Sequence, residues 1–129
     1  MNGVEFLLDT NIVIGLLKRD AIAVQSLEAA NAPVLRCAIS QISRMELLGY
    51  PSITSYEIEN IQKLLQIITV VLVDDEVESS AIAFRRLGGV KLPDAIVAGT
   101  AIAKKLKLLT LDLSLREALN RNGFNRHIA

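Results

Sequence analysis

The sequence predicts an α/β fold in which a mostly parallel sheet of four to five strands is covered by helices on both faces. Short apolar runs typical of strands alternate along the chain with longer segments of helical pattern. Strands that are separated by helices favour parallel pairing. The chain has 129 residues, 51% of them hydrophobic, which is enough for one core and argues against wholesale disorder. We therefore expect a single domain over residues 1–129.

Strands are predicted where short runs of apolar residues occur, and the run at 70–73 is rich in β-branched side chains. The predicted strands are residues 4–8, 34–39, 70–73, 108–111 and, at one edge, 124–128. Pro33 introduces the second strand, and crossovers between such parallel strands are expected to be right-handed.

Helices are predicted from apolar periodicity together with start and stop residues. They cover residues 12–18, 22–30, 41–48, 54–67, 75–87, 93–106 and 114–120. Two capping boxes mark helix starts, Thr54-x-x-Glu57 and Ser114-x-x-Glu117. Gly49 and Gly88 follow the ends of the third and fifth helices, as glycines often do.

Composition excludes several classes of protein. One cysteine and one histidine leave no internal disulfide and no standard structural zinc site. No apolar run reaches the roughly 18 residues of a membrane span, and the N-terminus does not resemble a signal peptide, so we expect a cytoplasmic protein. Cys37 is expected to be a small core residue.

Charge is balanced overall but uneven along the chain. Residues 1–79 carry 5 basic and 11 acidic side chains, whereas residues 80–129 carry 9 basic and 3 acidic ones. This asymmetry is typical either of a nucleic-acid surface or of helix faces that are solvated differently, and both interpretations stay open.

Four acidic residues fall at corresponding places in the predicted fold. Asp9 and Asp112 directly follow the first and fourth strands, and Glu46 and Asp94 lie in the early turns of helices. The carboxyl ends of parallel strands share one edge of the sheet, which is where ligands bind. Each acid also has a local explanation as a helix cap, a capping-box partner, a dipole partner or a turn residue.

Four carboxylates at one edge repel one another unless a cation lies between them. Oxygen ligands without histidine or cysteine favour a hard ion, Mg²⁺ or Mn²⁺. Such an ion can orient a phosphodiester and lower the pKa of water, so the pattern indicates a metal-dependent hydrolase.

Four motifs in order resemble the signature of PIN-domain nucleases, most closely the VapC-type toxins of toxin–antitoxin pairs. The motifs are Leu-Leu-Asp9-Thr10-Asn11, Ser43-Arg-Met-Glu46-Leu-Leu, Leu92-Pro93-Asp94-Ala95 and Leu109-Thr110-Leu-Asp112. The resemblance covers residues 4–112 and implies a three-layer α/β/α sandwich, in agreement with the predicted elements.

The resemblance also implies an activity and a site. Asp9, Glu46, Asp94 and Asp112 would be the catalytic, metal-binding acids, and Thr10, Asn11 and Thr110 would be supporting polar residues. The expected function is Mg²⁺- or Mn²⁺-dependent endoribonuclease activity, as the toxin of a type II pair. The expected partners are an RNA substrate, a cognate antitoxin and a second copy of the chain in a homodimer, with no membrane.

Arg85, Arg86 and Lys91 flank the Gly88-Gly89 loop that leads to Asp94. We expect them to contact RNA phosphates near the metal, although a solvated helix end is an equal alternative. Other functions stay open: an RNA-processing nuclease without an antitoxin, a metal-free binding module, or a phosphoacceptor signalling domain. The last is disfavoured because no lysine follows the fourth strand at Leu111.

Overall fold

The protein is built around a four-stranded, all-parallel sheet. The computed structural model describes residues 3–129. The strands are β1 (Phe6–Leu8), β2 (Cys37–Ser40), β3 (Thr69–Val71) and β4 (Lys107–Leu109), in the order β3-β2-β1-β4. Phe6 is in register with Cys37 on one side and Lys107 on the other. From β1 the chain adds β2 and β3 on one side, and then crosses over to add β4 on the other side of β1. The strand order therefore switches between β1 and β4, and ligands bind in the crevices at such switch points.

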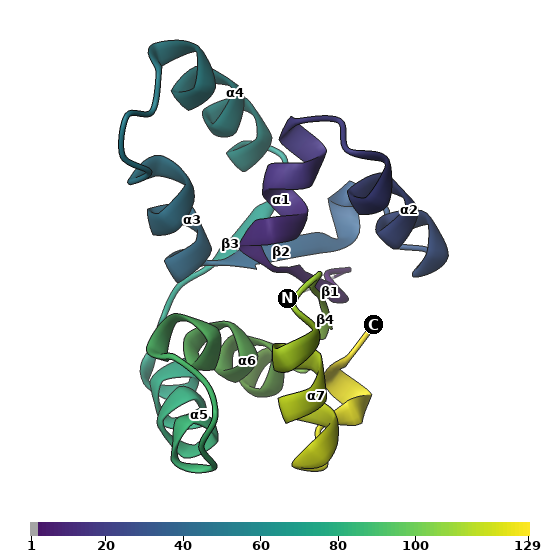
Figure 1. Cartoon of the computed structure of the whole chain (residues 1–129), viewed down its shortest axis with the longest axis vertical. Helices are drawn as coiled ribbons and strands as arrows, with labels where there is room; N and C mark the ends of the chain where they lie inside the picture. The colour runs from purple at the N-terminus through teal and green to yellow at the C-terminus, as the bar shows by residue number, and fades with distance from the viewer. Residues whose placement is uncertain (1–2) are drawn as a thin grey trace.

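Helices cover both faces of this sheet, which confirms the predicted α/β fold (Figure 1). One layer holds α1 (Thr10–Leu17), α2 (Ala21–Ala29), α3 (Gln41–Leu48) and α4 (Ser55–Leu65). The other layer holds α5 (Asp75–Arg86), α6 (Leu92–Lys104) and α7 (Leu113–Arg121). Among the described residues, no helix is long and apolar enough to cross a membrane.

The core is divided into two halves by the sheet. Phe6 and Leu8 of β1 pack into the half under α1–α4, whereas Leu7 packs into the half over α5–α7. All three residues of β1 are buried, as expected for a strand covered on both faces. Cys37 is fully buried in the first half, and burial raises the pKa of its thiol to about 11. It is a core residue, as predicted.

Close packing joins α5 to α6. A Cβ atom at Gly99 of α6 would lie 2.5 Å from the backbone nitrogen of Ala81 in α5, so only glycine fits there. At the far end of α6, Lys104 Nζ lies 2.7 Å from Asp74 Oδ2 and 3.0 Å from Glu76 Oε1. These contacts fix the axis of α6, the helix that carries Asp94.

Several predicted boundaries need correction. Residues 34–36 form a 3₁₀ helix, and only the remainder of the second predicted strand is β2. The capping box at Thr54 and Glu57 is confirmed, but the one at Ser114 is wrong because Asp112 caps α7 instead.

The predicted edge strand at 124–128 is also wrong. Residues 125–127 form a 3₁₀ helix, and only one isolated bridge joins Ile128 to Leu108. The Phe124 ring packs edge-on against Phe84 with centroids 5.8 Å apart, and the Ala129 backbone donates to the Leu108 carbonyl at 2.9 Å, so the tail touches the edge of the sheet without forming a strand.

Candidate active site

The four predicted acids come from four different elements and lie at one end of the sheet. Asp9 follows β1 and caps α1, and Asp112 caps α7 after β4. Glu46 lies on α3, and Asp94 lies in the first turn of α6. Partial burial raises the pKa of Asp94, and the charges of the other three acids raise it further. The four carboxylates are therefore close enough to repel one another.

Asp9 is the most enclosed of these acids, with only 6% of its surface exposed. Its Oδ1 accepts a hydrogen bond from the Thr10 backbone at 2.8 Å, and its Oδ2 accepts one from Thr110 Oγ1 at 2.7 Å. Burial raises the pKa of Asp9 and the charge of Asp112 adds to the rise, while the hydrogen bonds oppose it. The carboxylate is thus held in one orientation in a place where its negative charge is costly.

Asn11 and Thr110 tie the end of β4 to the start of α1. The Asn11 side-chain amide donates to Asp9 Oδ2 and to Thr110 Oγ1, both at 3.3 Å. Its Oδ1 accepts from the Leu111 backbone at 3.1 Å, and Thr110 Oγ1 accepts from the Asp112 backbone at 3.0 Å. The loop that carries Asp112 is therefore held against Asp9.

Glu46 is exposed, and Thr10 holds it. Thr10 Oγ1 lies 2.7 Å from Glu46 Oε1 and 2.9 Å from the hydroxyl of Ser43. The alternative that Glu46 completes a capping box with Ser43 is wrong, because the N-cap of α3 is Ser40 and its hydroxyl accepts from the Ile42 backbone.

The donor chemistry of the site fits a hard divalent cation. All four acids offer oxygen, and a cation would offset the burial and the like charges that raise the pKa values of Asp9 and Asp94. Within residues 3–129, however, no three Asp, Glu, His or Cys side chains stand close enough together to hold one ion as they are placed. The four acids therefore fit a cation in the type of their ligand atoms and in their charge.

One basic side chain lies near the acids, and three others lie on the neighbouring ends of α5 and α7. Lys91, the exposed N-cap residue of α6, partly offsets the raised pKa of Asp94. Arg85 and Arg86 are exposed at the last turn of α5. Sequence reasoning missed a fourth base, Arg121 of α7, whose guanidinium lies 3.5 Å from where a Cβ of Gly89 would be. Arg121 is far from Gly89 in the sequence, so the sequence alone does not show that the two lie close together.

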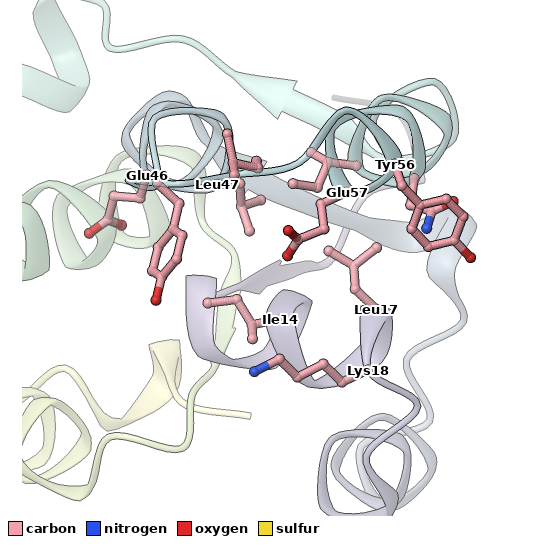
Figure 2. Close-up of a pocket in the computed structure, with 11 residues that line it drawn as sticks. Ile14, Leu17, Lys18, Glu46, Leu47, Tyr56 and Glu57 are labelled. Atoms are coloured by element: carbon pink, nitrogen blue, oxygen red, sulfur yellow. The ribbon is translucent and has the colours of Figure 1, made fainter.

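An apolar groove begins at the acidic site and runs between α1, α3 and α4. It has a volume of about 440 Å³ and includes Glu46 in its lining. Figure 2 shows Ile14 and Leu17 of α1, with Lys18 just after this helix, facing Leu47 of α3 and Glu57 of α4. Tyr50 and Tyr56 on its wall are 65% and 73% exposed. The sequence did not indicate this groove.

Comparisons with known proteins agree with this fold. A toxin–antitoxin complex from Klebsiella pneumoniae contains a chain 31% identical to this one, with a TM-score of 0.72 over 84% of this chain and 87% of that one. DNA-bound VapBC from Salmonella typhimurium has 24% identity and a TM-score of 0.72 over 88% and 91% of the two chains.

VapBC2 from Rickettsia felis, bound to a fragment of its promoter DNA, has 17% identity and the same TM-score of 0.72 over 91% and 95%. At these lower identities, the Salmonella and Rickettsia structures support the fold alone. A comparison with curated protein sequences finds no match. A sequence model of the PIN domain matches residues 6–119. The resemblance predicted from the motifs is confirmed, and the chain belongs to the PIN domain family.

Proposed function

We propose that this chain is a Mg²⁺- or Mn²⁺-dependent endoribonuclease, that it acts as the toxin of a type II toxin–antitoxin pair, and that residues 1–129 work as one domain. The observation that carries the proposal is the convergence of four carboxylates from β1, α3, α6 and α7, with three of them raising the pKa of the fourth, Asp94. The similarity to a chain of a toxin–antitoxin complex supports the biological role.

In this proposal Asp9, Glu46, Asp94 and Asp112 hold the cation and are the catalytic acids. A bound Mg²⁺ or Mn²⁺ supplies a Lewis acid that polarises the phosphodiester and favours ionisation of water. Thr110 and Asn11 fix the Asp9 carboxylate through hydrogen bonds at 2.7 and 3.3 Å. Thr10 orients Glu46 by its bond at 2.7 Å.

Arg85, Arg86 and Lys91 contact the RNA backbone in this proposal. They are exposed, and the charge of Lys91 reaches Asp94. Lysine and arginine neutralise phosphates, so binding should weaken as salt rises. Replacing Arg85 and Lys91 by alanine is expected to weaken RNA binding and flatten its salt dependence. Unchanged affinity and an unchanged salt slope would leave these residues as a solvated surface.

The cognate antitoxin docks in the apolar groove between α1, α3 and α4. Two features support this occupant: the groove is continuous with the acidic site through Glu46, and the similar Klebsiella chain is part of a toxin–antitoxin complex. Apolar side chains of the antitoxin would cover Ile14, Tyr50 and Tyr56. We also propose a homodimer, which light scattering after size exclusion would test.

The test is cleavage of a pool of total RNA by purified, antitoxin-free protein with Mg²⁺, Mn²⁺ or EDTA. Wild type should cut with metal and lose activity in EDTA, and Asp94→Asn should be inactive. Asp75→Asn is the matched control, because Asp75 is also an acid in the first turn of a helix, α5. It lies far from the site, since its neighbour Asp74 pairs with Lys104 at the other end of α6. Lys104 is about 15 Å along α6 from Asp94.

Two outcomes would redirect the assignment. If folded wild type cuts nothing with either metal, a binding or signalling role replaces catalysis. If it cuts RNA but no antitoxin is encoded beside it, a processing nuclease replaces the toxin. Cleavage that survives Asp94→Asn would mean that the carboxylate site is wrong.

A further inference from the structure

The hydroxyl of Ser43 lies near the acids but has no role in the proposed function, unlike those of Thr10 and Thr110. Ser43 lies on α3 one turn before Glu46, and none of its surface is exposed. Its only side-chain partner among the described residues is Thr10 Oγ1, at 2.9 Å. A buried hydroxyl costs free energy unless it is hydrogen-bonded, so the bond to Thr10 matters.

The direction of hydrogen bonding follows from counting hydrogens. Thr10 Oγ1 has two oxygen neighbours, Ser43 Oγ at 2.9 Å and Glu46 Oε1 at 2.7 Å, but only one hydroxyl hydrogen. An ionised carboxylate can only accept. The hydrogen of Thr10 therefore goes to Glu46, and Ser43 donates its own hydrogen to Thr10.

We propose that Ser43 is a positioning residue for Glu46. By donating to Thr10, it turns the Thr10 hydroxyl hydrogen toward Glu46 and prevents Thr10 from adopting another rotamer. Glu46 is exposed, so the Thr10 bond is the one side-chain hydrogen bond that the described residues give it. The relay runs from a buried group in α3, through α1, to a carboxylate of the site. Partners of this kind orient metal-binding carboxylates and raise metal affinity.

This inference rests on the proposed metal-dependent function, and its test separates the two. Mn²⁺ affinity is measured by calorimetry on metal-free wild type and on Ser43→Ala, Ser43→Thr and Thr100→Val. Ser43→Ala should raise the Mn²⁺ Kd about 10-fold, and Ser43→Thr, which keeps the donor, should recover most of that loss. Thr100→Val is the matched control. Thr100 is equally buried and its hydroxyl lies 3.2 Å from the hydroxyl of Ser40, but among the described residues neither hydroxyl bonds to a carboxylate.

A double-variant comparison tests whether Ser43 acts through Glu46. In a Glu46→Gln background, Ser43→Ala should produce no further loss of Mn²⁺ affinity. A full additional loss there, or wild-type affinity in Ser43→Ala alone, would overturn the inference.

A metal-free crystal structure of Ser43→Ala tests the role of Ser43 without relying on metal binding or RNA cleavage. The inference expects the Thr10–Glu46 hydrogen bond to be broken or Glu46 to occupy more than one rotamer. Glu46 held by Thr10 as in wild type would refute the inference, even with the nuclease active. If wild type neither binds Mn²⁺ nor cleaves RNA, the proposed function fails, and this structure still decides the role of Ser43.

Discussion

Neutralising Asp94 should stabilise the metal-free protein while it abolishes cleavage. Partial burial is the largest cause of the raised pKa of Asp94, followed by the charges of Asp112, Asp9 and Glu46, and Lys91 opposes them only in part. In the folded chain this carboxylate is therefore less stable when ionised than it is in the unfolded chain. Asp94→Asn keeps the shape of the side chain and removes the charge.

The sign of the pH dependence follows from linkage. Because the folded pKa lies above the unfolded one, the folded state binds more protons between the two values, and stability falls as pH rises through that window. At neutral pH wild type carries the whole penalty, and below the unfolded pKa it carries none. The benefit of Asp94→Asn should accordingly be present at pH 7 and disappear near pH 3.

The magnitude is modest because Asp94 is only partly buried. One unit of pKa shift corresponds to about 1.4 kcal/mol, and solvent screening reduces the value for a side chain that reaches water. We expect a gain of about 1 kcal/mol in the free energy of unfolding at pH 7, with an increase of about 3–5 °C in Tm.

Thermal unfolding in EDTA, at pH 7 and at acidic pH, measures this effect. Asp75→Asn is the control, because Asp75, like Asp94, is an acid in the first turn of its helix, so the exchange removes the same favourable interaction with a helix N-terminus outside the site. Adding Mn²⁺ should raise the Tm of wild type more than that of Asp94→Asn. A lower Tm for Asp94→Asn in EDTA at pH 7, or a gain that persists at pH 3, would refute the electrostatic reasoning.

Three further predictions concern single side chains. Thr110→Val removes the donor to Asp9 Oδ2, so Mn²⁺ affinity by calorimetry should fall about 10-fold, and an unchanged Kd would show that Asp9 does not need Thr110. Gly99→Ala brings a methyl against the backbone of Ala81, so urea unfolding should show a loss of about 1–3 kcal/mol; wild-type stability would mean that α5 and α6 can separate freely. Cys37 is fully buried with a pKa of about 11, so a thiol reagent at pH 8 should label only unfolded protein, and rapid labelling of the native chain would contradict this placement.

The fold could be predicted because the residues that begin and end each helix in the sequence agree with the way the helices and strands pack in the structure. The helix at 41–48 was predicted with the bounds that the structure has, since Gly49 and Pro51 end it. The tail could not be predicted, because its apolar residues satisfy a strand pattern equally well. In the structure its residues contact distant parts of the chain, with Phe124 against Phe84 forty residues away and Ile128 beside Leu108.

The candidate site was only partly predictable, for a related reason. The sequence indicated the acids because each lies just after a predicted strand or in the early turns of a predicted helix. It did not indicate Arg121 beside Gly89 or Ser43 beside Thr10, since both proximities depend on how distant elements pack. Periodicity along one element carries no information about contacts between elements 33 residues apart, as Thr10 and Ser43 are.

Asp112 shows that a local role and a site role can coexist in one carboxylate. Its Oδ1 accepts from the Ser114 and Leu115 backbones at 2.9 and 3.2 Å, which leaves Oδ2 without a hydrogen bond among the described residues. The two roles can be separated because asparagine is also a good N-cap whereas alanine is not.

Asp112→Asn should therefore abolish Mn²⁺-dependent cleavage while its Tm in EDTA stays at or above that of wild type, because the cap is kept and one repelling charge is lost. Asp112→Ala should also be inactive but less stable than Asp112→Asn by about 1 kcal/mol, the cost of a lost cap. Thermal unfolding beside an RNA cleavage assay measures both effects. If the two variants were equally stable, the cap at α7 would contribute nothing, and if Asp112→Asn kept full activity, Asp112 would be a cap alone.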